Sequence, residues 1–388
     1  MIEQKYRTIF LIVILDLMGI GIIFPLLPFY AANFNSDPIM IGLILALYPI
    51  MQFFFAPVLG HFSDKYGRKP ILIISLLGSA VGYLILGLAT NIWMLFIARI
   101  IDGATGGNIS TAQAHISDIS DEKDRRKAMG MIGMAFGIGF MLGPLVGGFL
   151  GHFNPSYPGF FAGFLALVSA GLVHFTLKES KREIVQQPLK PSIYIDVLRD
   201  EKLRPFFLTS FVFPLAAASA FFLVDPLFVG KVFGYTEAEI GVLFGFIGLI
   251  SIFVQGFVIR KLDSKFSDIK LIKIGLVATL LSFVALAGIV FIPALAFPLL
   301  VVSTLITPFG HGLVFPTIKS YISKSGKETG KLMGDVDSYI SIANAIGPIL
   351  GGVIFSIGLN TPFIFGGIVV ALLLGVLHLG AKERVKKD

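Results

Sequence analysis

The chain contains no cysteine, one tryptophan and few charged residues. Without cysteine there is no disulfide framework, no thiolate metal site and no thiol nucleophile. Charged residues make up 14% of the 388 residues, against about 25% in a typical soluble domain. The six histidines are scattered and lack the spacing of metal ligands. We therefore predict a protein that is neither an enzyme nor dependent on a metal or cofactor.

Long apolar stretches dominate the chain, and 55% of its residues are hydrophobic. A bilayer core of about 30 Å needs roughly 20 apolar residues per helix. Windows of that length indicate twelve transmembrane helices, so the predicted fold class is an all-α integral membrane protein. The predicted spans cover about 8–30, 39–59, 71–90, 92–117, 128–151, 158–177, 205–230, 239–259, 271–292, 296–318, 332–356 and 361–380.

Basic residues are distributed unevenly among the predicted loops. If both termini lie on one side, 29 of the 31 lysines and arginines fall on that side, and the two others are Arg99, inside the fourth span, and Lys231. The positive-inside rule then places both termini in the cytoplasm. We predict a multi-pass protein of the cell membrane, whose net charge of +7 reflects this topology and not a nucleic-acid partner.

Two patterns recur at similar spacing, which indicates an internal repeat. Gly-Pro-Leu-Val-Gly-Gly at 143–148 in span five returns as Gly-Pro-Ile-Leu-Gly-Gly at 347–352 in span eleven, 204 residues later. Asp64, in the basic loop after span two, has a counterpart in Asp263, 199 residues later. The repeat predicts two pseudo-symmetric six-helix bundles that enclose a cavity near the membrane midplane.

A polar, charged stretch separates the two copies and sets the predicted domain boundaries. We expect an N-terminal bundle at 1–177, a cytoplasmic linker at 178–204 and a C-terminal bundle at 205–388. The linker is either a solvated connector or a segment whose apolar face lies against the headgroups. That face would contain Ile193, Val197 and Leu198.

The loop after span two has the pattern G-x-x-x-D-x-x-G-R-K. It resembles the signature loop of the major facilitator superfamily. The resemblance implies that Asp64 contacts the N-terminus of span eleven when the protein is open outward, and that Arg68 pairs with Asp118 at the end of span four. The residues predicted to act in gating are Gly60, Asp64, Gly67, Arg68, Lys69 and Asp118.

Three spans of the N-terminal half narrow this resemblance. The stretches 15–28 in span one, 99–107 in span four and 139–148 in span five are similar to motifs of twelve-span drug/proton antiporters, above all the tetracycline/proton antiporters and their multidrug relatives. Tetracycline carriers have an acidic residue in span three, where this chain has Gly82. The motif of span five is associated with antiporters, and its residues here are Gly143, Pro144, Gly147 and Gly148.

Asp16, Arg99 and Asp102 fall near the middle of predicted spans. On insertion scales a charged residue there costs roughly 2.5–3.5 kcal/mol, so such residues usually have a role. A carboxyl group in an apolar surrounding favours its neutral form, whereas a nearby guanidinium favours the carboxylate. We predict that the three residues couple transport to protons, with Asp16 and Asp102 competing for Arg99. The alternative is an architectural pair of Arg99 with Asp102.

The predicted function is secondary active transport by alternating access. The leading hypothesis is proton-coupled antiport, exporting lipophilic small molecules or drugs, and the alternative is a proton-coupled symporter or facilitator of a sugar or other metabolite. The expected partners are a small-molecule substrate, protons and the lipid bilayer. We expect the protein to act as a monomer.

Overall fold

Apolar residues on all sides of long segments favour helices whose backbone hydrogen bonds are satisfied internally. A computed structural model of the chain describes residues 4–120, 122–179, 203–221, 224–263, 265–324 and 329–385, and these contain no strand. Eleven helical segments in this part of the chain are long and apolar enough to cross a membrane. The predicted all-α membrane fold is thus confirmed.

Eight helices form the first half, and four of its six predicted spans each correspond to a single helix. Span one is divided at Phe24-Pro25-Leu26, where proline removes a helical donor. The helices are α1 (Gln4–Ile23), α2 (Leu27–Ala32), α3 (Pro38–Tyr66), α4 (Arg68–Gly87), α5 (Ile92–Ala104), α6 (Asn108–Ile119), α7 (Glu122–Phe153) and α8 (Tyr157–Thr176).

The second half continues in the same way, with one π-helical turn at Val254–Val258 and one 3₁₀ turn at Pro293–Leu295. The predicted linker segment 180–202, including its expected apolar face, lies outside the described residues. The helices are α9 (Arg204–Phe221), α10 (Val224–Phe233), α11 (Glu237–Phe253), α12 (Ile259–Asp263), α13 (Asp268–Phe291), α14 (Ala296–Ser323), α15 (Thr329–Ile357) and α16 (Thr361–Val385).

The predicted fourth span is interrupted. It consists of α5 and α6, separated by Thr105-Gly106-Gly107, and each part alone is too short to cross a bilayer. This break explains why eleven rather than twelve segments have the length of a span. The span predicted over 92–117 thus contains a break that the sequence analysis did not indicate, because hydropathy records length and composition but not local geometry.

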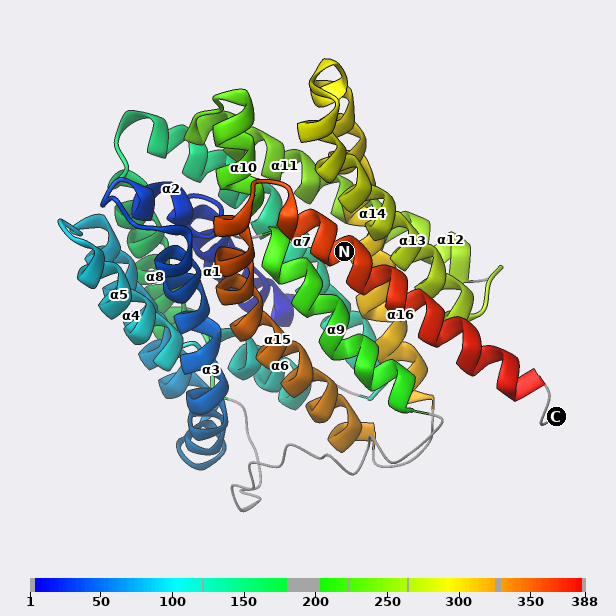
Figure 1. The fold of residues 1–388 in the computed structure, drawn as a ribbon. Helices are drawn as coiled ribbons and strands as arrows, with labels where there is room; N and C mark the ends of the chain where they lie inside the picture. The colour runs from blue at the N-terminus through cyan, green and yellow to red at the C-terminus, as the bar shows by residue number, and fades with distance from the viewer. Residues whose placement is uncertain are drawn as a thin grey trace. The chain divides into compact units, whose positions relative to one another are not determined.

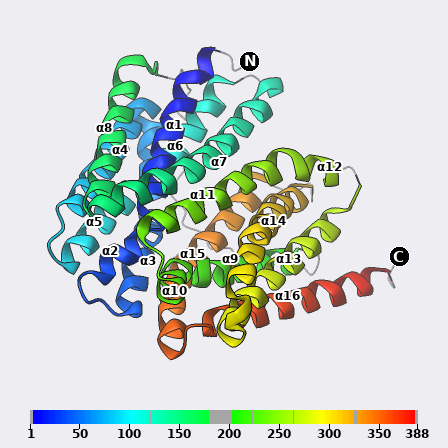
Figure 2. The ribbon, with the colours of Figure 1, turned by 90° about the horizontal axis from the view of Figure 1, so that it is seen from above.

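Contacts between helices divide the chain into two compact units. Unit 1 contains 1–36, 47–191 and 229–249, and unit 2 contains 37–46, 192–228 and 250–388. The first residues of α3 belong to unit 2, whereas the end of α10 and most of α11 belong to unit 1. Within unit 1, α1 packs on α7 and α4 packs on α8, and within unit 2, α9 lies beside α15 and α16 (Figure 1) and α13 beside α14 (Figure 2).

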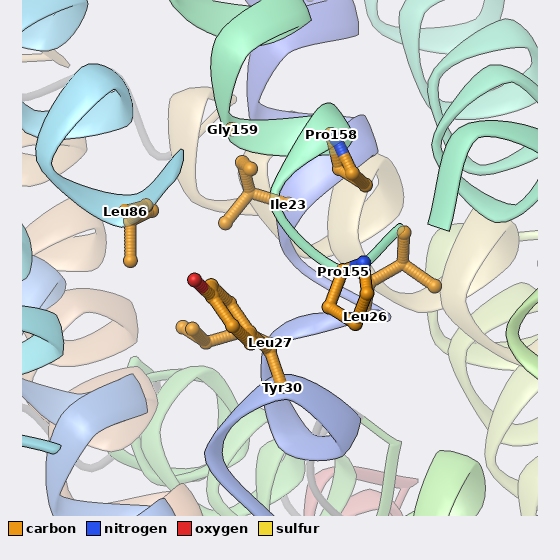
Figure 3. A pocket seen from close by; sticks show the side chains of 8 residues that line it. All are labelled: Ile23, Leu26, Leu27, Tyr30, Leu86, Pro155, Pro158 and Gly159. Carbon is orange, nitrogen blue, oxygen red and sulfur yellow. The ribbon is translucent and has the colours of Figure 1, made fainter. Parts of the chain in front are cut away.

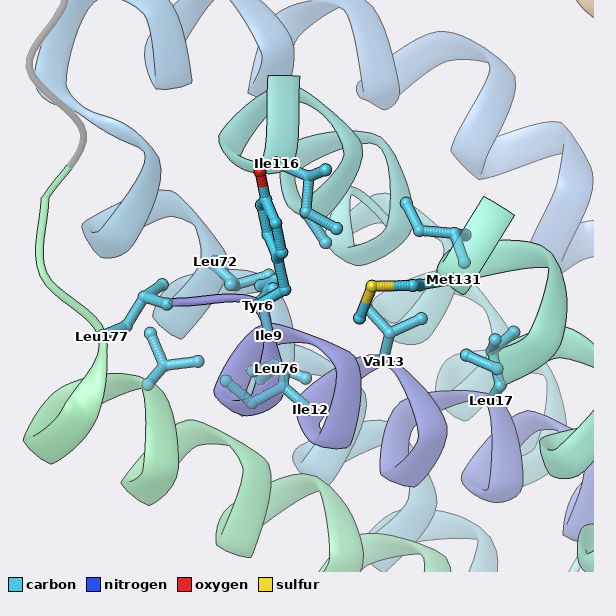
Figure 4. Close-up of a cluster of buried hydrophobic side chains, with 14 of the residues drawn as sticks. Tyr6, Ile9, Ile12, Val13, Leu17, Leu72, Leu76, Ile116, Met131 and Leu177 are labelled. Carbon is cyan, nitrogen blue, oxygen red and sulfur yellow. The ribbon is translucent and has the colours of Figure 1, made fainter. Parts of the chain in front are cut away.

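The interior of unit 1 includes a tight apolar cluster at one end of α1. Ile9, Ile12 and Leu17 of α1 are almost completely buried, and they pack with Leu76 of α4 and Ile116 of α6 (Figure 4). Close packing of this kind fixes the positions of the helices against one another. The cluster therefore holds α1, α4 and α6 as a rigid support for the polar side chains that they carry.

Candidate functional site

Asp16 lies inside unit 1, with only 4% of its surface exposed. Asn108, the first residue of α6, donates a hydrogen bond from Nδ2 to Asp16 Oδ1 at 2.7 Å. The same amide nitrogen lies 3.2 Å from Ser79 Oγ on α4. A charged group at the centre of a span is usually held by such partners. Asp16, Asn108 and Ser79 therefore join three helices through one polar contact.

Arg99 and Asp102 form a second buried group on α5. Arg99 Nη2 lies 3.0 Å from Asp102 Oδ2, and the two side chains are 5% and 1% exposed. The guanidinium carbon also lies 5.8 Å from the ring centre of Tyr48 and 5.7 Å from that of Tyr83. Two aromatic rings at this distance attract a cation through their π faces. Arg99 is therefore stabilised by one carboxylate and two rings.

In this structure Asp16 accepts a hydrogen bond from Asn108, whereas Arg99 pairs with Asp102. The predicted approach of Asp16 to Arg99 would therefore belong to another conformation. Arg99 Nε and Nη2 and both oxygens of Asp102 are buried without a hydrogen-bond partner among the described residues. The ion pair therefore has the distance but not the alignment of a hydrogen bond. Groups of this kind retain free hydrogen-bonding capacity that a proton, water or another side chain can use.

A glycine lets α5 and α4 approach at this point. A side-chain carbon added to Gly82 would lie 2.9 Å from Asp102 Cβ and 3.0 Å from the carbonyl oxygen of Ala98. Asp102 of α5 thus lies directly against Gly82 of α4. The carboxylate comes from α5, while α4 contributes the Tyr83 ring beside Arg99.

The break between α5 and α6 sets the positions of the Arg99–Asp102 pair before it and of Asn108 after it. A helix end inside a membrane leaves backbone groups that need other partners. Gln52 of α3 donates from Nε2 to the carbonyl oxygen of Gly106 at 2.7 Å, and Thr105 Oγ1 donates to the carbonyl of Ile101 at 2.8 Å. The break places Asn108 at the start of α6, where its side chain reaches Asp16.

The predicted gating loop joins α3 to α4 through Gly67. Its φ of 104° lies in the region that favours glycine. Arg68 is buried and donates from Nε to Asp118 Oδ2 at 2.9 Å, as the resemblance implied, while Nη1 lies 2.8 Å from Asp64 Oδ1. Asp64 and Asp118 therefore both contact Arg68 in this structure. Gly60 has open space around its α-carbon, so close packing does not explain a glycine there.

Glu179 is a member of this group that sequence reasoning missed. It follows α8, yet its Oε1 accepts a hydrogen bond from the backbone N–H of Arg68 at 2.7 Å, and its Oε2 accepts one from that of Lys69 at 3.2 Å. A carboxylate at a helix N-terminus satisfies free N–H groups and interacts favourably with the helix dipole. Lys69 Nζ donates to the carbonyl of His174 at 2.7 Å. The loop is therefore tied to the end of α8.

The glycine-proline motif of span five lies on α7 and contacts two helices. Carbons added to Gly143 and Gly147 would lie 2.8 Å and 2.7 Å from backbone atoms of α1. A carbon added to Gly148 would lie 2.5 Å from the carbonyl oxygen of Glu237, at the start of α11, and one added to Gly241 would meet the carbonyl oxygen of Pro144. The motif therefore allows α7 to touch its neighbours backbone to backbone.

Its repeat on α15 makes equivalent contacts. Gly347 and Gly351 face Ala218 and Ser219 of α9, while a carbon added to Gly42 of α3 would meet the carbonyl oxygen of Pro348. Gly42 and Gly241 are 199 residues apart, the same offset as Asp64 and Asp263. The two copies of the repeat thus make equivalent helix contacts. These contacts include Gly42 and Gly241, which the motifs in the sequence did not indicate.

A small apolar pocket lies in unit 1 (Figure 3). It lies between the end of α1, α2, the end of α4 and the start of α8, and its lining includes Leu27, Leu86 and Pro158. Tyr30, also in its wall, donates a hydrogen bond to the carbonyl of Ala89 at 3.1 Å. The described residues contain no cluster of three histidine, aspartate or glutamate side chains that could hold a metal ion.

Comparison with known proteins identifies the family. A model described as Major Facilitator Superfamily matches residues 9–336. The chain belongs to this superfamily. It is 34% identical to the tetracycline resistance protein, class H, of Pasteurella multocida over 99% of this chain and 98% of that protein. It is also 31% identical to multidrug resistance protein 2 of Bacillus subtilis, over 98% and 97% of the two chains.

A solved structure of another transporter has the same fold. The human organic anion transporter MFSD10 superposes with a TM-score of 0.72 and 22% identity, covering 96% of this chain and 98% of that one. As a member of the major facilitator superfamily, the protein is a multi-pass membrane transporter. Its efflux relatives agree with the predicted drug-efflux function.

Proposed function

We propose that this protein exports lipophilic small molecules in exchange for protons, and that Asp16 carries the proton. The observation behind the proposal is the arrangement in unit 1, where two buried carboxyl groups and one guanidinium occupy neighbouring polar clusters. The relatives named for tetracycline and multidrug resistance support the choice of substrate class. We further propose that the protein works as a monomer with both termini in the cytoplasm.

The mechanism follows from competition for one cation. A carboxyl group away from a cation in an apolar site favours its neutral form, and one beside a guanidinium favours its charged form. Arg99 is paired with Asp102 in this structure, and Asp16 is bonded to Asn108. We propose that a second conformation brings Arg99 toward Asp16. Asp16 would release its proton in that second conformation and take up a proton in the conformation described above.

The gating loop supplies the second part of the proposal. Arg68 is bonded to Asp118 and Asp64 in this structure. We propose that Asp64 leaves Arg68 and contacts the N-terminus of α15 when the protein opens outward. The glycines and prolines of α7 and α15 would then limit leakage, because backbone contact leaves little space for water.

The test of coupling uses three substitutions in proteoliposomes with tetracycline and ethidium as probes. Asp16→Asn should abolish accumulation driven by a pH gradient but retain downhill exchange, and Arg99→Ala should abolish both. Asp102→Asn should stay partly active if Asp102 only neutralises Arg99. Gradient-driven accumulation that is unchanged in Asp16→Asn would move the proton site elsewhere, with Asp102 the next candidate.

A matched control is available outside the buried clusters. Asp37 caps α3 by accepting a hydrogen bond from the backbone N–H of Met40 at 2.7 Å. Asparagine caps helices as well as aspartate does. Asp37→Asn should therefore behave as wild type in both assays, which separates a specific effect at Asp16 from a general effect of removing one carboxylate.

A further inference from the structure

Four polar side chains on α4 and α6 are buried with unsatisfied atoms. Ser75 Oγ, Asn108 Oδ1, Thr111 Oγ1 and His115 Nδ1 have no hydrogen-bond partner among the described residues, and each side chain belongs to a residue at most 6% exposed. Most buried polar atoms in proteins bond to protein or water. Buried water typically occupies places where several such atoms meet. The positions of these four side-chain atoms therefore decide whether the atoms can share one water site.

The four side chains face one seam between the two helices. At 100° per residue, Asn108, Thr111 and His115 lie within about 60° of one another on α6 and extend over about 10 Å. A carbon added to Gly107 would lie 3.3 Å from Ser75 Oγ, so Ser75 faces the start of α6. Ser79, one turn further along α4, is the residue that bonds to Asn108.

The seam has a carboxyl group at one end and charged groups at the other. Asn108 bonds to Asp16. At the other end, His115 lies one turn before Asp118, which accepts a hydrogen bond from Arg68 of the gating loop. From Asn108 to Asp118 the helix rises about 15 Å, roughly half the thickness of a bilayer core.

Apolar side chains enclose the seam. Ala112 and Ile116, on the adjoining face of α6, and Leu72 and Leu76 of α4 belong to the buried cluster shown in Figure 4. Packed apolar side chains therefore border the seam. A line of water and hydroxyl groups in such surroundings can pass a proton from one oxygen to the next.

We infer that the α4–α6 seam holds a chain of water molecules that conducts protons between Asp16 and the gating loop, with His115 as a relay. His115 accepts a proton from water at Nδ1 and passes one on, so that neither the imidazole nor the waters gain or lose a proton over a cycle. The route lies inside unit 1. The inference rests on the proposed proton coupling at Asp16.

Water in the seam is testable without any transport assay, because the chain has no cysteine. We would introduce one thiol at a time as Ser75→Cys, Thr111→Cys and Ala112→Cys in the full-length protein. After transfer to D₂O, infrared spectra record the exchange of S–H to S–D. The first two thiols should exchange at least tenfold faster than the thiol at 112, which faces the apolar cluster. Equal rates at all three positions would refute the water chain.

Proton conduction is tested by removing the seam's hydroxyl groups. The double variant Ser75→Ala and Thr111→Val, and separately His115→Phe, should reduce pH-driven ethidium accumulation in proteoliposomes about tenfold and leave ethidium exchange without a gradient unchanged. His115→Gln, which keeps a polar side chain, should restore part of the driven transport. The control is Ser169→Ala, which removes a buried unpartnered hydroxyl on α8.

The outcomes separate this inference from the proposed function. If Asp16→Asn abolishes driven accumulation while the seam variants keep it, the seam is not the proton route although the coupling proposal stands. If the wild type shows no pH-driven accumulation of ethidium or tetracycline, the proposed function fails, and the exchange of S–H to S–D still decides whether the seam contains water.

Discussion

Gly143→Ala should destabilise the contact between α7 and α1. An added carbon would lie 2.8 Å from the α-carbon and carbonyl carbon of Gly21 and from the carbonyl oxygen of Met18. Nonbonded carbon atoms prefer about 3.5–4.0 Å, so the two helices would have to separate by roughly 1 Å. Backbone atoms cannot rotate away as side chains do. Overpacking of this kind costs about 1–3 kcal/mol.

Helix propensity acts in the opposite direction. Alanine is more favourable than glycine inside a helix by about 1 kcal/mol, so the net effect at Gly143 should be a loss of about 0–2 kcal/mol. Gly133 lies on the same helix, and no atom of the described residues comes within 4 Å of a carbon added there. Gly133→Ala therefore tests propensity alone and should be neutral or stabilising.

The assay is the apparent unfolding temperature of purified protein in detergent at one fixed heating rate, because membrane proteins often unfold irreversibly. Gly143→Ala should unfold below the wild type, and Gly133→Ala at or above it. Gly351→Ala and Gly334→Ala provide the same comparison on α15, where an added carbon at 351 meets the Ser219 carbonyl oxygen and one at 334 meets nothing. Equal midpoints within each pair would contradict the packing argument.

Three further predictions concern polar contacts. Asp118→Asn removes the charge opposite the buried Arg68, and should lower the unfolding temperature and transport rate, whereas Asp118→Glu should recover part of both. Gln52→Leu leaves the carbonyl of Gly106 without its donor, at a cost of about 1–3 kcal/mol, measured by thermal unfolding against Gln52→Asn. Glu179→Gln keeps an acceptor for the N-terminus of α4 but loses the charge. Proteolysis near the loop should therefore increase modestly in Glu179→Gln. It should increase strongly in Glu179→Ala, which has no acceptor. Unchanged digestion in Glu179→Ala would show that this contact does not hold the loop.

Sequence reasoning succeeded where the relevant signal is local. Hydropathy predicted the membrane fold, and spacing of three residues on one helix predicted the contact of Arg99 with Asp102. The pairing of Arg68 with Asp118, 50 residues apart, was accessible only through family resemblance. Whether these residues couple protons or gate transport remains a prediction, since geometry alone shows their contacts and not their action.

The missed features depend on residues distant in the sequence. The break before α6 is satisfied by Gln52, 54 residues away from Gly106, and hydropathy contains no trace of that contact. Glu179 reaches the N–H of Arg68 across 111 residues. Gly241 lacked a recognisable motif, since its role becomes visible only when the carbonyl of Pro144 lies against it. Each of these needs the packing of two helices to be known first.

The backbone contacts of α7 with α11 have a consequence for how easily such helices can slide. At Gly148, Gly241 and Gly248 the two backbones meet directly, with Gly248 against the carbonyl oxygen of Phe140, and the Leu145 side chain packs against Gly245. Attraction there comes from dispersion and weak Cα–H···O contacts. Helices that interlock through large side chains must change rotamers to shift. Helices that meet mainly through backbone atoms can change their crossing angle with few rotamer changes.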